Sequence, residues 1–217
     1  MLSPMLASEE AYLLGKYIRS IDPQAVLVLG PVPTAPADQV FNHYISKKET
    51  FRIQAEKVPN RRGIERVIAK LGGPTMPWDE FAAAKAPAAL KAGWVTAGYH
   101  SDWLGGNIPA VLKKGFRVVQ DLLATSLAQS ADVLLPSAVW VEKEGSWENW
   151  QNKIQAFTAA FPPRQGAMVE GAVYAKLLGL GSYDPAVVRQ ELGDEFAAVE
   201  VPTSVEMNEP APEFLEI

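Results

Sequence analysis

The sequence predicts an α/β fold with a doubly wound, mostly parallel sheet and helices on both faces. A continuous apolar run over 25–30 has the pattern of a strand that is buried on both faces, as in a parallel sheet. Further short apolar runs occupy 94–97, 116–120 and 133–135. Helical patterns separate these runs, and strands that alternate with helices are typical of a parallel sheet.

The first helix is predicted over residues 8–20. Ser8 suits its N-cap position, and Glu9 and Glu10 suit its first turn, where acidic side chains interact favourably with the helix dipole. Apolar residues at i, i+3, i+4 and i+7 give the helix one buried face, and Pro23 ends it.

The middle of the chain is predicted to hold a short helix over 38–45, a strand over 51–55 and a helix over 63–71. The last of these ends at a pair of glycines. Asp79 is expected to cap the next helix, which Pro87 interrupts.

The remaining chain is predicted to contain a short helix over 108–114, an irregular segment over 137–161, and helices over 167–178 and 184–192. Asp184 is a good N-cap, and the proline after it suits the first helical position. Three tryptophans are interpreted as the hydrophobic anchor of the irregular segment, or as its contact with a neighbouring domain: Trp140, Trp147 and Trp150.

The charge is unevenly distributed along the chain. The net charge is −5, but eight acidic and no basic residues follow Arg189, which leaves about +3 on the rest. We expect residues 1–200 to form a single α/β domain with a sub-boundary near 59–77, and residues 201–217 to form an acidic flexible tail. Two interpretations of the tail stay open, a solubilising end and a docking strand for a partner.

The composition excludes several classes of function. The absence of cysteine rules out disulfides, thiolate catalysis and cysteine-ligated iron–sulfur or zinc sites. Only two histidines occur, so no histidine-based metal site is expected. Phosphate-loop, dinucleotide-fingerprint and hydrolase motifs are missing. We expect no nucleic-acid binding from this acidic chain, and membrane contact only indirectly, through partners.

Two polar clusters leave alternatives open. His100 lies near Asp102 and could act as a general base, which would make the chain a small independent enzyme. A lone histidine beside a loop carboxylate is more often a surface or capping residue. The basic residues between Lys47 and Lys70 could meet phosphates or could form a solvated face.

The most informative segment is 116–155. Asp121 ends a predicted strand, and open α/β sheets bind ligands at the carboxyl ends of their strands. Its carboxylate could accept hydrogen bonds from a guanine or a ribose, and the Thr125 hydroxyl could assist. Both side chains could equally cap the turn and the following helix.

This segment contains a dense series of motifs, which in chain order are the strand ending at Asp121, the turn with Thr125, Ala131–Pro136, Glu142–Ser146, Asn149 and Gln155. The series resembles the molybdopterin oxidoreductase superfamily, which includes formate dehydrogenases and the G chain of NADH-quinone oxidoreductase (complex I). Weaker matches at 59–63 and 92–98 extend the resemblance.

The resemblance implies a site for molybdopterin guanine dinucleotide. The candidate cofactor-binding residues are those that match the family's motifs: Asp121, Thr125, Asp132, Glu142 and Asn149. Glu142 and Asn149 also have a structural interpretation, in which they hydrogen-bond the backbone of an irregular loop. No catalytic residue and no metal ligand is expected in this chain.

Departures from the family pattern favour a vacant site of the complex I type. Leu127 stands where the family usually has a second threonine, Gln151-Asn152-Lys153 replaces a Glu-Gly-Arg-like run, and 54–58 lacks the catalytic arginine of formate dehydrogenases. The resemblance therefore implies a scaffold module of a G-chain-like redox protein without its own redox centre. The alternative is half of a molybdopterin guanine dinucleotide site in a formate dehydrogenase-like oxidoreductase.

The relatives carry a cysteine-rich iron–sulfur region and a barrel domain that have no counterpart in this sequence. We therefore expect a middle part of such a protein, either a separate small subunit or an excised piece. Iron–sulfur clusters are expected only in other segments or in partner subunits of the redox complex. We expect the chain to be cytoplasmic, peripheral to the inner membrane through that complex, and not catalytic alone.

Overall fold

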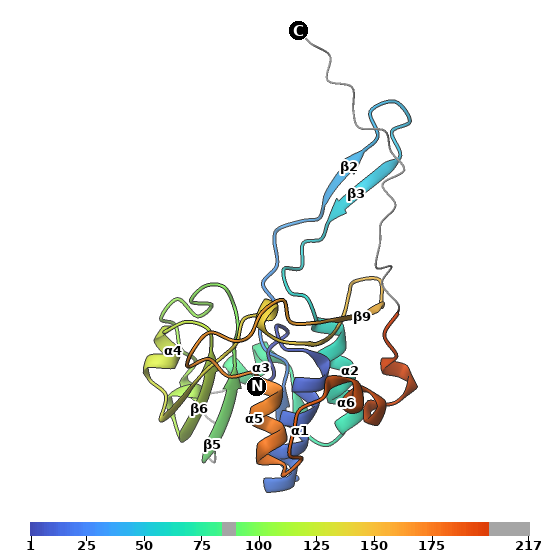
Figure 1. The fold of residues 1–217 in the computed structure, drawn as a ribbon. Coiled ribbons are helices and arrows are strands. Elements are labelled where there is room, and N and C mark those ends of the chain that lie inside the picture. Colours follow the sequence, from blue (N-terminus) through green and yellow to red (C-terminus); the bar gives the residue numbers. More distant parts are fainter. Residues whose placement is uncertain (84–89, 200–217) are drawn as a thin grey trace.

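The computed structural model describes residues 1–83 and 90–199. The predicted tail and the predicted break at Pro87 lie outside these residues. The expected α/β class is confirmed, because parallel strands alternate with helices along the chain (Figure 1). In the described part of the chain, no helix has the length and apolar character of a membrane span.

The central element is a three-stranded parallel sheet of β5 (Ala92–Thr96), β6 (Phe116–Asp121) and β7 (Val133–Pro136), in that order. Its strands lie where the apolar runs predict them. The connections are short: the 3₁₀ helix η1 (Ala110–Lys113) precedes β6, and α4 (Ser126–Gln129) precedes β7.

A second parallel pair, β1 (Leu27–Val28) with β4 (Thr75–Met76), continues this layer. The first residues of the chain lie between the two sheets. The Leu2 amide donates to the Val28 carbonyl at 2.8 Å, and the Thr96 amide donates to the Met1 carbonyl at 3.2 Å. The strand expected over 25–30 is therefore shorter than predicted, yet it belongs to one hydrogen-bonded parallel layer.

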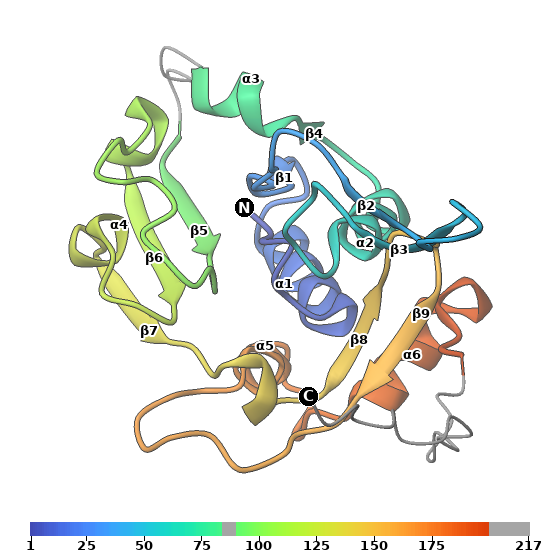
Figure 2. The ribbon, with the colours of Figure 1, turned by 90° about the horizontal axis from the view of Figure 1, so that it is seen from above.

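The main helices pack together beside this layer. They are α1 (Ser8–Ile21), α2 (Arg61–Leu71), α5 (Glu170–Leu177) and α6 (Pro185–Leu192). Figure 2 shows α1 in the middle, between β5 and the hairpin of β8 (Gly145–Glu148) and β9 (Ile154–Phe157). The buried core formed by these helices includes Leu14, Ile64, Tyr174 and Leu192.

Two of the three predicted helix caps are wrong. The N-cap of α1 is Ala7, whose amide donates to the Glu10 carboxylate at 2.9 Å, so that Ser8 lies inside the helix. Asp79 lies in the first turn of α3 (Trp78–Ala83) and not before it. The Asp184 cap is confirmed, since its Oδ1 accepts the Ala186 amide at 2.9 Å.

Two hairpins occur where the sequence predicted other structure. The helix expected over 38–45 is wrong, because β2 (Gln39–Asn42) pairs antiparallel with β3 (Glu49–Ile53). Aromatic and β-branched residues are frequent in this stretch, and they favour strands once a pairing partner is present.

The segment over 137–161 is only partly irregular. It begins with the 3₁₀ helix η2 (Trp140–Glu142) and continues as a hairpin of β8 (Gly145–Glu148) and β9 (Ile154–Phe157). A last 3₁₀ helix, η3 (Asp194–Phe196), follows α6.

Candidate functional site

Asp121 lies at the carboxyl end of β6, where the sequence places it, and its side chain is held by its own chain. Its Oδ1 accepts the Leu122 amide at 2.8 Å and the Gly98 amide at 3.3 Å, and its Oδ2 accepts the Thr125 hydroxyl at 2.9 Å. The side chain is buried, with 3% of its surface exposed. Burial raises the pKa of Asp121, while these hydrogen bonds act in the opposite direction.

Thr125 joins this arrangement from the start of α4. It is the N-cap residue, and its hydroxyl accepts the Ala128 amide at 3.3 Å while donating to Asp121. The structure thus brings Asp121 and Thr125 together, in a geometry that ties strand, turn and helix to one another.

Asp132 lies at the other end of the sheet. Its Oδ2 accepts the amide of Arg117, which is the second residue of β6, at 2.7 Å. Asp121 is four residues further along the same strand, or about 13 Å away at strand spacing. Asp132 and Asp121 therefore do not face one ligand.

Glu142 lies on a different loop from Asp121, and its carboxylate holds its own loop in place. Its carboxylate accepts the Val139 amide at 3.1 Å and the Arg164 amide at 3.0 Å. It also borders a cavity of about 370 Å³, which is lined in addition by Leu122, Ser137 and the segment 164–167. This cavity, here called the edge groove, lies beside the carboxyl ends of β6 and β7.

Asn149 shapes the turn between β8 and β9. Its Oδ1 accepts the Gln151 amide at 2.9 Å and the Lys153 amide at 3.1 Å, and its Nδ2 donates to Gln155 at 3.2 Å. The five candidate residues therefore lie in four separate places, and only Asp121 and Thr125 touch each other.

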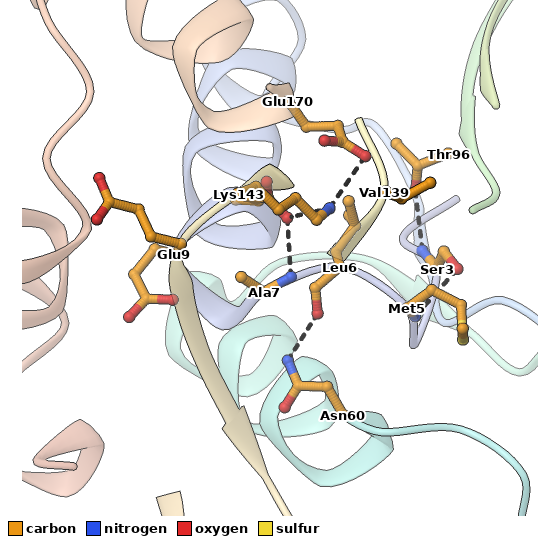
Figure 3. A network of polar contacts seen from close by, with 12 residues as sticks. Ser3, Met5, Leu6, Ala7, Glu9, Asn60, Thr96, Val139, Lys143 and Glu170 are labelled. Carbon is orange, nitrogen blue, oxygen red and sulfur yellow. Dashed lines mark hydrogen bonds and ion pairs between the residues drawn. The ribbon is translucent and has the colours of Figure 1, made fainter. Parts of the chain in front are cut away.

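A buried ionic cluster, which the sequence motifs did not predict, lies next to the edge groove. Lys143 Nζ is 2.9 Å from a Glu10 carboxylate oxygen and 3.1 Å from Glu170 Oε1 (Figure 3). All three side chains are at most 4% exposed. Lys143 and Glu170 also line a small cavity of about 30 Å³ together with Gly98 and Leu122.

The charges in this cluster affect each other's protonation. Burial raises the pKa of Glu170 to about 7, although Lys143 counteracts the shift. Burial lowers the pKa of Lys143, but the two carboxylates outweigh it and raise the pKa above its ordinary value. The cluster carries one cation for two carboxyl groups, so Glu170 is the group that takes up a proton near neutral pH.

A second buried carboxylate, that of Glu9, joins parts of the chain that are distant in sequence. Glu9 accepts the Ser146 amide and the Ser146 hydroxyl, each at 2.8 Å, and forms an ion pair with Arg189. For the neighbouring Glu10 the sequence holds one signal of burial, because Leu13 and Leu14 follow it by three and four residues on the apolar face of the helix.

His100 and Asp102 show no contact with each other among the hydrogen bonds of the described residues. Both are exposed, and Asp102 accepts the Ser126 amide at 3.3 Å instead. Within residues 1–83 and 90–199, no group of three or more His, Asp or Glu side chains has the arrangement of a metal site.

Comparison with known proteins identifies a domain around these residues. Residues 91–178 match the family model "Molybdopterin oxidoreductase". All five candidate residues fall within this span. The match supports the resemblance of this segment to the molybdopterin oxidoreductase superfamily.

Individual relatives agree with this domain. The chain is 39% identical over 69 residues to the F420-dependent formate dehydrogenase subunit alpha of Methanocaldococcus jannaschii, covering 30% of this chain and 10% of the relative. It is 38% identical over 80 residues to a nitrate reductase of Symbiobacterium thermophilum, covering 36% and 11%. It is 34% identical over 87 residues to the F420-dependent formate dehydrogenase 2 subunit alpha of Methanococcus maripaludis, covering 39% and 13%. The matches thus span only about a tenth of the length of these relatives.

Proposed function

We propose that this chain is a structural module of a molybdopterin-type oxidoreductase, which holds neighbouring redox domains or subunits in place without a redox group of its own. The observation that carries the proposal is the burial and internal hydrogen bonding of Asp121. This carboxylate stands at the edge where such sheets bind ligands, and it is buried and hydrogen-bonded by its own chain.

The hydrogen bonds that Asp121 already accepts leave few acceptor positions for a guanine. A carboxylate has about four acceptor positions, and Leu122, Gly98 and Thr125 already occupy three of them. A ligand that displaced the two amides would leave buried donors unpaired, at about 1–3 kcal/mol for each. Asp121 therefore does not fit the role of a free guanine acceptor.

The departures from the family pattern support a vacant site. Leu127, where the family usually has a threonine, is fully buried in the core beside β5 and β6 and offers no hydroxyl. Gln151 and Lys153 belong to the β8–β9 turn, where their amides donate to Asn149. These features favour a scaffold of the kind found in the G chain of NADH-quinone oxidoreductase.

The edge groove favours a second candidate function, half of a site for molybdopterin guanine dinucleotide. Its volume of about 370 Å³ lies within the range of ligand pockets. Arg164 could hold a phosphate there, and Ser137 and Glu142 could accept or donate hydrogen bonds at the rim. In this candidate the cofactor supplies the redox chemistry, and Asp121 and Thr125 position the loop beside it.

Both candidate functions imply the same partners and the same location in the cell. The partners are other subunits or domains of a redox enzyme, which carry its iron–sulfur clusters. We place the assembly in the cytoplasm, at the inner membrane only through those partners.

Calorimetric titration of the purified chain with GDP and with isolated molybdopterin guanine dinucleotide separates the two candidates. The scaffold proposal predicts no saturable heat up to millimolar GDP, from a chain whose circular dichroism shows that it is folded. Saturable binding that is lost in Arg164→Ala and retained in Asp132→Ala would replace the scaffold by the dinucleotide site. Asp132→Ala is the matched control, because Asp132 lies at the opposite end of the sheet.

A further inference from the structure

The β2–β3 hairpin extends away from the body of the protein as an arm (Figure 1). Its large apolar side chains are not covered by the described residues. Phe41 and Phe51 are 49% and 60% exposed, and Tyr44 and Ile45 near the tip are 86% and 80% exposed. The arm precedes the matched segment 91–178 and is no part of it.

One face of the arm is apolar. Residues directly opposite each other on paired strands point to the same side, and Phe41 is paired with Phe51. The centroids of the two phenyl rings are 5.8 Å apart. Ile53, two residues beyond Phe51, is on this side as well.

The other face is closed by ion pairs. Arg52 bonds Asp38 Oδ2 at 2.9 Å and binds both oxygens of Glu49, at 2.9 and 2.6 Å. Asp38 in turn accepts the Ala55 amide at 2.8 Å. The charged groups of this face are thus paired with one another, although Val40, which is opposite Arg52, adds an apolar side chain that is 44% exposed. The Phe41–Phe51 face has no partner among the described residues.

The charges that remain unpaired on the arm are positive. Arg52 neutralises Asp38 and Glu49, and Arg61 lies 2.7 Å from Glu56. Within the described residues, no ion pair includes Lys47 or Lys48 at the tip. A surface that matches the arm must therefore be apolar and edged by carboxylates.

The size and the charge of the arm do not favour a dimer of this chain through the arms alone, because two facing arms would bring their Lys47 and Lys48 side chains together. The exposed parts of its six large apolar side chains, among them Val40 and Ile53, amount to about 700 Å². A stable interface takes about 800 Å² from each partner. The area of the arm is thus that of one contact among several in a larger assembly.

We propose that the hairpin over 39–53 is a docking arm for another polypeptide of the same oxidoreductase, which receives the Phe41–Phe51 face in an apolar hollow edged by Asp and Glu side chains. The identity of the partner rests on the proposed function. The docking itself rests on the amphipathic arm and on Lys47 and Lys48, which form no ion pair within residues 1–83 and 90–199.

Site-specific photo-cross-linking in the intact complex tests the proposal. The full chain carries p-benzoylphenylalanine in place of Tyr44, and a matched control carries it in place of Val187, which is 60% exposed on α6. We expect the Tyr44 position alone to cross-link to a peptide of another oxidoreductase chain that contains apolar residues flanked by Asp or Glu. Cross-links to residues 200–217 of the same chain, to a second copy, or to nothing would overturn the proposal.

Two surface variants supply an independent measurement. Phe41→Ser with Phe51→Ser, and Lys47→Glu with Lys48→Glu, should each reduce co-purification of the cross-linked partner at least tenfold, while Val187→Ser leaves it unchanged. Equal recovery with all variants would refute docking through this arm. Dinucleotide binding in the titration together with the expected cross-link would remove the scaffold proposal and leave the docking arm in place.

Discussion

Replacing Lys143 with methionine removes the cation that lies between Glu10 and Glu170, with little change in side-chain volume. The Lys143 side chain is 4% exposed, and the two carboxyl groups are 0% and 3% exposed. Water therefore cannot replace the lost contacts at 2.9 and 3.1 Å.

The magnitude follows from this burial. Removing one partner of a buried ion pair typically lowers the free energy of unfolding by about 3–5 kcal/mol, because a charge is left uncompensated. Lys143→Met leaves two such carboxyl groups, so we expect a loss of about 4 kcal/mol at pH 7.5. The loss should shrink at pH 5, below the pKa of Glu170, where this carboxyl group carries a proton.

Urea unfolding followed by tryptophan fluorescence measures this difference. Lys70→Met is the matched control, because the Lys70–Glu195 ion pair is 41% and 45% exposed and should contribute at most about 1 kcal/mol. A loss for Lys143→Met no larger than that for Lys70→Met, or independent of pH, would refute the reasoning.

Three further predictions concern single side chains. Because the pKa of Glu170 is raised to about 7, the folded state holds its proton more tightly than the unfolded state, and stability should fall by about 3 kcal/mol as the pH rises from 4.5 to 7. Glu170→Gln should flatten that dependence in urea titrations at a series of pH values, and an unchanged slope would contradict the assignment. Asn60→Ala should cost about 3 kcal/mol in the same assay, since Asn60 is buried and joins the Leu6 carbonyl at 2.9 Å to the Glu148 amide at 2.8 Å. Asp184→Ala should cost only about 1 kcal/mol, through the lost cap of α6, and a thermal melt indistinguishable from wild type would argue against this cap.

The parallel strands could be predicted because their pattern is local. Continuous apolar runs specify β5, β6 and β7, and the position of Asp121 at the end of such a run places it at the carboxyl edge. The weaker match at 59–63, in which Gly63 follows Asn60 by three residues, also has a local reason, since a side chain at Gly63 would come within 2.1 Å of Asn60 Oδ1.

The buried ionic cluster could not be predicted in the same way. Glu10 and Lys143 are 133 residues apart, and no local pattern reports a contact at that separation. An acidic residue in a first helical turn fits the helix dipole equally well whether it is exposed or buried. The hairpin over 39–53 escaped prediction for a related reason, because strand propensity is decided by the cross-strand partner.

Hydrogen exchange at the amides of Gly98 and Leu122 tests the scaffold account most directly, because both amides donate to Asp121. The account predicts slow exchange at both amides, at rates unchanged by molybdopterin guanine dinucleotide at millimolar concentration. A change in exchange at these two amides with the ligand, without a change at the Arg117 amide at the other end of β6, would show that the carboxyl edge binds the cofactor and would contradict the account.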